Sequence, residues 1–147
     1  MDITVPENRS GKKLALRIPA WSKNTSVQTG NKTYRPAAGE YFISDAPMGN
    51  ITVTFDLTPY TEAGGGEYGG KCSIYAGPVL YAYDLAANRD FDFDSIPPVP
   101  ENELKTAVPV RKKDGRISLK FSNGVTLTNF GRAGDSGTPY KTWLSAE

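Results

Sequence analysis

The sequence of 147 residues contains no histidine, one cysteine and no long apolar run. Without histidine, the chain lacks the commonest general base and the commonest metal ligand at neutral pH. The single cysteine, Cys72, cannot form an internal disulfide, and no imidazole is present to activate its thiol. No stretch approaches the roughly 18 apolar residues that a membrane-spanning helix needs. These absences exclude catalytic triads and histidine-ligated metal sites built from this chain alone.

Charge of one sign is also lacking, because 17 basic and 16 acidic residues leave a formal net charge of +1. Such a balance provides no basic field for nucleic acid and no acidic tail. The basic runs at 12–13 and 111–113 flank strand-like segments, and we interpret them as solvated strand ends rather than phosphate sites. The first residues lack a basic region followed by an apolar region, so we expect no signal peptide within this chain.

What the sequence does contain is a period of two. Apolar residues alternate with polar ones over residues 14–18, 51–57 and 117–121, and valine and leucine alternate with threonine over 125–128. One apolar and one polar face per strand is typical of antiparallel sheets that pack on one side. No segment keeps a period of 3.6 residues, and the best helix candidate is a single turn at 101–105.

The turns agree with this pattern. Gly30-Asn31, Asp114-Gly115 and Asn123-Gly124 each separate two strand-like runs, and such pairs readily adopt the positive φ angles of tight hairpins. With 15 glycines and 11 prolines between short runs, we count about nine strands. The sequence therefore predicts an all-β antiparallel β-sandwich, jelly-roll or immunoglobulin-like, as a single domain over residues 1–147.

One glycine-rich segment, residues 65–72, approaches a phosphate-binding loop. That motif requires serine or threonine after its lysine and a helix after the loop. Here Cys72 follows Lys71, and the next residues continue as a strand. We interpret the segment as a surface loop.

An acidic segment reproduces part of the carboxylate spacing of a calcium-binding loop. Hard cations such as Ca²⁺ prefer carboxylate oxygens, but the glycine required at the sixth position is Ser95 here, and three prolines follow. The alternative is an extended segment whose phenylalanines face the core while the aspartates face water. Glycoside hydrolysis also needs paired carboxylates, but no pair stands out and we assign no catalytic residues. The calcium candidates are Asp90, Asp92, Asp94 and Glu101.

Aromatic residues are the other signal for carbohydrate, because sugar rings stack on flat apolar faces. Trp21 follows a strand and Pro19, and Trp143 lies in the terminal strand-like run. Both positions also suit packing at the end of a core, where tryptophan and tyrosine are normally held. The ligand-binding candidates are Trp21, Trp143, Tyr34 and Tyr68, with core packing as the alternative.

Several phrases resemble the C-terminal β-sandwich of the bacterial glycoside hydrolases related to β-L-arabinofuranosidase, family 127. Residues 14–21, Leu-Ala-Leu-Arg-Ile-Pro-Ala-Trp, resemble the family's Leu-Arg-Ile-Pro-Gly-Trp corner. Residues 76–84, Ala-Gly-Pro-Val-Leu-Tyr-Ala-Tyr-Asp, resemble its Gly-Pro-Leu-Val-Tyr-Ala strand, and residues 129–144 resemble its final strand. The order and spacing of these phrases fit the family.

The resemblance implies a fold and a partner rather than a catalytic site. In the family, an (α/α)₆ barrel carries a zinc ion held by cysteines and a glutamate, and one cysteine is the nucleophile. None of that barrel is present here, and Cys72 matches none of its ligand positions. A zinc site needs about four ligands that include cysteine or histidine, so we expect no cofactor in this chain and zinc only in the missing barrel.

We therefore expect a non-catalytic accessory sandwich that packs against and stabilises a helical catalytic barrel, in the same chain or another. The alternatives are a stand-alone carbohydrate-binding module, whose ligand would be a plant or microbial polysaccharide, and a small interaction or adhesion module. The family is enzymatic, but the chain alone is expected to be inactive. The resemblance implies a bacterial cytoplasm or periplasm, and neither nucleic acid nor a membrane is an expected partner.

Overall fold

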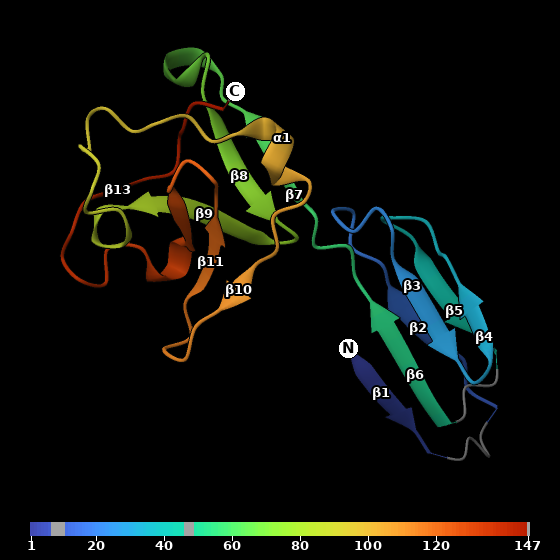
Figure 1. Ribbon diagram of the computed structural model, residues 1–147. Helices are drawn as coiled ribbons and strands as arrows, with labels where there is room; N and C mark the ends of the chain where they lie inside the picture. The colour runs from blue at the N-terminus through green and yellow to red at the C-terminus, as the bar shows by residue number, and fades with distance from the viewer. Residues whose placement is uncertain (7–10, 46–48, 147) are drawn as a thin grey trace. The chain divides into compact units, whose positions relative to one another are not determined.

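The computed structural model describes residues 1–6, 11–45 and 49–146, and its secondary structure is almost entirely β (Figure 1). The chain divides into two compact units, Met1–Leu57 and Thr58–Glu147. We call them unit 1 and unit 2 and describe each by itself. No helix among the described residues is long and apolar enough to span a bilayer.

Unit 1 contains two antiparallel sheets around one small core. Its four-stranded sheet has the order β1-β6-β3-β4, and β2 pairs with β5 in a two-stranded sheet. The buried core side chains are Ile18, Val27, Ile51 and Val53, and both sheets contribute half-buried neighbours to them. The strands are β1 (Asp2–Val5), β2 (Leu14–Arg17), β3 (Ser26–Thr29), β4 (Lys32–Tyr34), β5 (Tyr41–Ser44) and β6 (Gly49–Thr54).

The corner after β2 follows the pattern expected from the sequence. Ile18 is fully buried, and its backbone amide donates to the Glu40 carbonyl at 2.8 Å. The Ser22 amide then donates to the Pro19 carbonyl at 3.1 Å, which turns the chain. The Ser22 hydroxyl accepts from the Asp56 amide at 2.8 Å. The corner therefore links β2 to the segment that follows β6.

Unit 2 contains one larger sheet of order β10-β11-β12-β9-β8-β7, with β13 also paired to β9. All its strand pairs are antiparallel. The strands are β7 (Pro59–Ala63), β8 (Cys72–Ala76), β9 (Val79–Asp84), β10 (Val110–Arg111), β11 (Ile117–Lys120), β12 (Thr126–Asn129) and β13 (Tyr140–Lys141). The helical pieces are the 3-10 turns η1 (Gly66–Tyr68), η2 (Leu85–Ala87) and η3 (Phe130–Arg132), and the one-turn helix α1 (Glu101–Leu104).

The core of unit 2 lies between this sheet and the segment over residues 91–107. This segment places Val99 and Leu104 in the core and packs half-buried Phe91 and Phe93 against it. The aspartates that alternate with these phenylalanines are exposed, as the period of two predicted. The buried side chains are Ile74, Ala76, Tyr81, Tyr83, Val99, Leu104, Leu119, Phe121, Val125, Leu127 and Leu144.

The face of the unit 2 sheet that points away from the core is buried in part, although alternation predicts that it is exposed to solvent. Thr126 and Thr128 of β12 and Ser118 of β11 are all buried, although they alternate with core residues. Asn88 explains part of this burial, because its side-chain amide exchanges two hydrogen bonds of 2.8 Å with the Thr126 backbone. Alternation alone does not reveal that η2 covers this face.

The expected hairpins form, with a correction to their geometry. Among the described residues, positive φ angles occur only at glycine, so Asp114 and Asn123 do not adopt them. Gly115 and Gly124, at φ 85° and 88°, each follow a turn closed by a bond from the glycine amide to the carbonyl three residues earlier. These are three-residue loops rather than two-residue ones. Gly30, at φ 55°, begins the two-residue loop between β3 and β4.

The all-β antiparallel fold and the single helical turn near residues 101–105 are confirmed. The described residues form thirteen strands rather than about nine, because short edge segments such as β1, β10 and β13 also pair. The single domain expected over residues 1–147 remains a prediction, since each unit has a core of its own.

Candidate functional site

The four aromatic candidates fall into two groups. Trp21 and Tyr34 lie in unit 1, where Trp21 is half-buried and Tyr34 is exposed. The Trp21 ring lies 5.6 Å from the Phe55 ring, and the Tyr34 ring lies 5.1 Å from that of Phe42, measured between centroids. Because each ring has a separate partner, these two residues do not form a shared platform.

Tyr68 and Trp143, in contrast, form a stacked pair in unit 2. Their ring centroids are 4.9 Å apart and their planes differ by 16°. Tyr68 ends η1 in the loop between β7 and β8, and Trp143 follows β13. Tyr68 keeps 37% of its surface exposed, whereas Trp143 is half-buried.

Backbone hydrogen bonds hold the two segments that carry these rings. The loop is closed by a 2.8 Å bond from the Gly64 amide to the Lys71 carbonyl. Directly after it, Cys72 and Leu144 exchange two backbone bonds of 2.8 and 2.9 Å. The rings therefore lie on backbone that is fixed at both sides of the stack.

Gly64 is required for this close packing. A Cβ added there would lie 2.5 Å from the Tyr68 carbonyl oxygen and 3.1 Å from Cζ3 of Trp143. A real Cβ atom would have to displace the loop backbone. The glycine-rich segment that resembles a phosphate loop thus serves to seat an aromatic pair.

A shallow cleft lies beside the stack. It measures about 120 Å³, well below the roughly 300–1,000 Å³ of sites that enclose a small molecule, so a ligand here would lie against an open surface. Segments from three parts of unit 2 converge on it. Its walls are Lys71, Asp94, Ile96, Lys141, Trp143, Leu144 and Ser145.

Lys141 is the best-anchored charged group of the cleft. Its Nζ donates to the Phe93 carbonyl at 2.7 Å and lies 3.7 Å from Oδ1 of Asp94. The same ammonium is 4.2 Å from the centroid of the Phe93 ring, a cation–π distance. Sequence reasoning did not select Lys141 or Lys71. The period of two in residues 140–144 was the available signal, since Lys141 and Trp143 share a strand face.

The calcium candidates are not gathered into a site. Among the residues described, no three histidine, cysteine, aspartate or glutamate side chains lie close enough together to hold a metal ion. Asp92 accepts a 3.0 Å bond from the Asp94 amide, and Asp94 faces Lys141. Glu101 begins α1 after Pro100, whereas Asp90 is exposed in the preceding loop.

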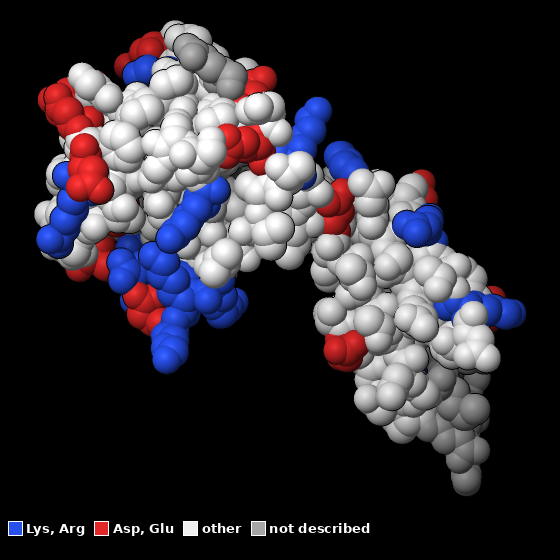
Figure 2. Space-filling model, viewed as in Figure 1, with Lys and Arg blue, Asp and Glu red and all other residues white. Residues whose placement is uncertain are grey.

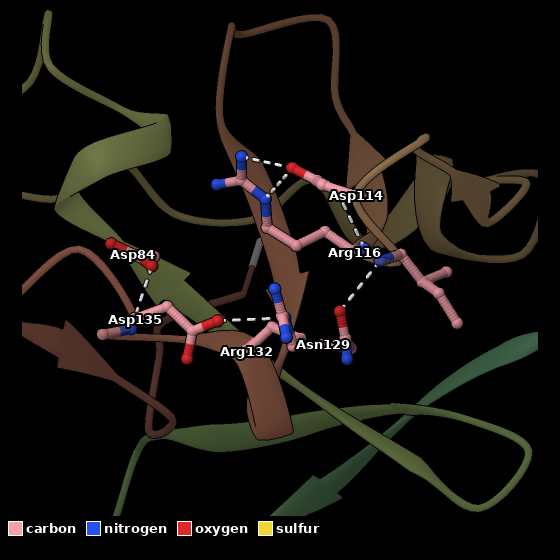
Figure 3. A network of polar contacts seen from close by, with 8 residues as sticks. Asp84, Asp114, Arg116, Asn129, Arg132 and Asp135 are labelled. Carbon is pink, nitrogen blue, oxygen red and sulfur yellow. Dashed lines mark hydrogen bonds and ion pairs between the residues drawn. The ribbon is translucent and has the colours of Figure 1, made fainter.

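A second polar network lies at the η3 end of unit 2 (Figure 3). Asp84 is 3% exposed, and its carboxylate accepts bonds from the Ala86 amide, the Gly134 amide and the Thr138 hydroxyl at 2.8–3.0 Å. Arg132 pairs with Asp135 at 2.9 Å on the same loop. Because both Asp84 oxygens accept hydrogen bonds and two of the three donors lie in residues 133–138, this acid fixes that loop.

The hairpin between β10 and β11 completes that network (Figure 3). The Arg116 Nε donates to Asp114 at 2.7 Å, and this hydrogen bond lowers the pKa of the Asp114 carboxyl. Figure 2 shows Lys and Arg side chains gathered at this hairpin. They are exposed or half-buried, as expected for solvated strand ends: Arg111, Lys112, Lys113, Arg116 and Lys120.

Cys72 begins β8 and is half-buried. Burial raises the pKa of its thiol, with a smaller contribution from Glu101. A raised pKa keeps the thiol protonated, which is opposite to what a nucleophile or a metal ligand needs. With one cysteine and no histidine in the sequence, the residues present do not fit a zinc ion.

Comparison with solved structures gives clear matches. A protein described as a glycoside hydrolase matches with a TM-score of 0.76 and 14% sequence identity, over 99% of this chain and 29% of its own. A GH127 β-arabinofuranosidase matches with a TM-score of 0.71 and 16% identity, over 99% and 29% of the two chains. The chain has the fold of one part of these enzymes. A GH127 β-L-arabinofuranosidase from Geobacillus stearothermophilus T6 gives 0.68 and 13%, over 92% and 26%.

The resemblance read from the sequence is thus confirmed at the level of the fold. No family model and no curated protein sequence matches the chain. The chain spans less than a third of the length of the GH127-like structures. Most of each of those proteins therefore has no counterpart here.

Proposed function

We propose that the chain is a non-catalytic accessory β-sandwich of a glycoside hydrolase related to β-L-arabinofuranosidases, and that it packs against a helical catalytic barrel outside this sequence. The observation that carries the proposal is the unequal coverage, 99% of this chain against 29% of its neighbours. A region of this kind, with its own fold, is a part of a larger enzyme.

The chemistry of the described residues supports a structural role. Its most buried acid, Asp84, is saturated by three hydrogen-bond donors from within its own unit. Its cysteine has a pKa raised by burial. Glycosidases need two carboxyl groups that reach the substrate, one of them protonated at working pH. On this proposal the catalytic groups and the zinc belong to the barrel.

Unit 1 offers a surface for that barrel on the outer face of the β2–β5 ribbon. Tyr41 and Ile43 of β5 are 61% and 50% exposed, and Ala15 of β2 lies opposite Ile43 in the register. Arg17 borders this face opposite Tyr41. A contiguous apolar face with a charged border is typical of an interaction surface. We call it the β2–β5 face and assign the barrel as its occupant, because the enzymes that share the fold extend far beyond it.

Two measurements test the accessory role. The pure chain should show no hydrolysis of β-L-arabinofuranosides, and any hydrolysis that persists through purification would overturn the proposal. The genomic reading frame around the chain should also encode a helical barrel, in the same frame or an adjacent one. A gene that encodes only this sandwich, with no barrel nearby, would contradict the partner.

The β2–β5 face is tested by producing that barrel and this chain as two polypeptides. We expect them to copurify, and we expect the double variant Tyr41→Ser, Ile43→Ser to abolish copurification. Val108→Ser is the matched control, because Val108 is 72% exposed but lies in unit 2. Copurification that survives the double variant would remove the β2–β5 face from the proposal.

Carbohydrate binding is the second candidate function, and the Tyr68–Trp143 stack favours it. Of the four aromatic candidates, these two are brought together, and they lie beside a cleft with charged walls. A flat ring bordered by hydrogen-bonding groups is what a sugar requires. Binding to plant or microbial polysaccharides, measured by calorimetry, tests this candidate, and no binding at millimolar concentration would overturn it.

A further inference from the structure

We propose that the cleft beside the Tyr68–Trp143 stack binds an anionic saccharide, a sugar ring that bears a carboxylate, and that Lys71 provides the selectivity for the charge. The inference rests on the second candidate function, carbohydrate binding. It adds the class of sugar and the residue that distinguishes it.

The cleft walls carry a net positive charge. They contain two cations, Lys71 and Lys141, and one anion, Asp94. The ammonium of Lys141 faces Asp94 at 3.7 Å and is further held by the Phe93 carbonyl and ring. Lys141 and Asp94 therefore offset each other, and the charge that remains is that of Lys71.

The Lys71 side chain is exposed and makes no ion pair or hydrogen bond with any residue in the described ranges. Its backbone is nevertheless fixed, because its amide donates to the Tyr68 carbonyl at 3.0 Å and its carbonyl accepts from Gly64 at 2.8 Å. The fixed backbone keeps the ammonium near the cleft, and because it has no partner there, an anion can pair with it without displacing an existing ion pair.

The aromatic stack leaves Tyr68 partly exposed. One face of each ring is covered by the other ring, and 37% of Tyr68 remains exposed. The Lys71 amide donates to the Tyr68 carbonyl at 3.0 Å, so the turn places the lysine next to the stack, and both Lys71 and Trp143 line the cleft. A hexuronate has both groups that this arrangement recognises, a flat C–H face and a carboxylate.

The alternative is that the stack only fastens the loop to the C-terminal segment. That role explains the contact between the rings, and it does not require an unpaired cation beside them. The two interpretations predict different effects of Lys71, since removal of an exposed lysine without partners leaves the fastening intact.

The test is calorimetric titration of the whole protein with oligogalacturonate and with a neutral galacto-oligosaccharide of equal length. We expect the anionic ligand to bind at least about tenfold more tightly at low salt, with the preference reduced at 0.5 M NaCl. Lys71→Gln should remove this preference, whereas Lys113→Gln, an exposed lysine on the β10–β11 hairpin, should leave it unchanged. Tyr68→Ala should weaken both ligands, and Tyr68→Phe should restore both.

The outcomes separate the two proposals. Equal affinity for both oligosaccharides, or a preference that survives Lys71→Gln, overturns the anionic inference and leaves carbohydrate binding in place. Absence of binding to either ligand at millimolar concentration overturns both. Thermal unfolding of each variant checks the fold, and a stable Lys71→Gln variant that loses only the preference for the anionic ligand supports the inference.

Discussion

The two units differ in what lies beneath their sheets. The core cluster of unit 1 contains four buried apolar side chains, whereas that of unit 2 contains eleven. Among the residues that the structure describes, buried polar residues are also fewer in unit 1, where they are Ser22 and Thr25, than in unit 2, where they include Asp84, Asn88 and Thr128. Small cores provide little stability, because most of a short chain remains at the surface. We therefore expect unit 2 to be the more stable body, and on the proposed function unit 1 would gain more from the barrel on its β2–β5 face.

Each unit contains one tryptophan, Trp21 in unit 1 and Trp143 in unit 2, which allows the comparison to be measured. Fluorescence of the Trp21→Phe protein reports on unit 2, and fluorescence of the Trp143→Phe protein reports on unit 1. Urea titration of the two proteins should give a lower midpoint for unit 1.

The largest expected effect is on the core of unit 2. Leu127 is fully buried in β12, and Leu127→Ala should lower the free energy of unfolding by about 3 kcal/mol, mainly in the Trp143 signal. Val53→Ala in unit 1 should cost about 2 kcal/mol and affect the Trp21 signal. If either substitution shifts both signals equally, the units unfold as one domain, and the comparison fails.

The next effect tests the buried acid that unit 2 contains. Asp84→Asn keeps the size of the side chain but turns one acceptor into a donor that faces an N–H or O–H donor. We expect a loss of about 2 kcal/mol in the urea stability of unit 2. The exposed Asp90→Asn is the control and should change stability by less than about 0.5 kcal/mol. Equal effects of the two substitutions would contradict the structural role of Asp84.

Two hairpin glycines, one in each unit, test the difference in stability between the units with smaller effects. Gly30 of unit 1 and Gly115 of unit 2 have φ angles of 55° and 85°, and an added Cβ would contact nothing at either position. Gly30→Ala and Gly115→Ala should therefore each cost about 1 kcal/mol from backbone strain alone. The melting temperature should fall further for unit 1, because the entropy of unfolding is smaller for a smaller body. A neutral substitution at either glycine would show that its turn rearranges freely.

The smallest effect is a pH dependence confined to unit 2. Glu103 accepts hydrogen bonds from the Ser122 hydroxyl and amide, and these bonds lower the pKa of its carboxyl. A lowered folded-state pKa stabilises the protein above the unfolded pKa, and this contribution is lost as the pH falls from the unfolded value through the lower folded one. Glu103→Gln should flatten the decline of the Trp143 midpoint between pH 6 and pH 3 and leave the Trp21 signal unchanged. If the Trp143 midpoint of the Glu103→Gln variant declines as in the original protein, other acids cause the pH dependence.

Local pattern predicted the local parts of this structure. Alternation placed β2, β6 and β11 on the correct faces, and the proline-rich start with acidic residues identified α1. The turn residues identified three hairpins, although the loop type at Gly115 and Gly124 required the φ angles themselves. These features depend on neighbours within a few residues, which sequence pattern can represent.

The buried polar residues of β11 and β12 and the cleft depend on contacts between residues far apart in the sequence. The alternation of apolar and polar residues does not predict such contacts. Asn88 bonds to the Thr126 backbone, and Lys141 bonds to the Phe93 carbonyl. Sequence analysis selected Tyr68 and Trp143 separately, and only the pairing of Cys72 with Leu144 brings their segments together. The local sequence around these residues does not indicate which distant residue each of them will contact.

The last strand segment has a consequence for how the protein is made. Residues 140–146 pair in turn with β9, with Cys72 of β8 and with Val99, so they complete backbone pairing at three places in unit 2. During synthesis, unit 1 has all its strands once Thr54 has left the ribosome, whereas unit 2 must wait for residue 146 with those places unpaired. Over that interval the nascent chain exposes unpaired strand positions, and a chaperone that shields them would raise the yield of folded protein.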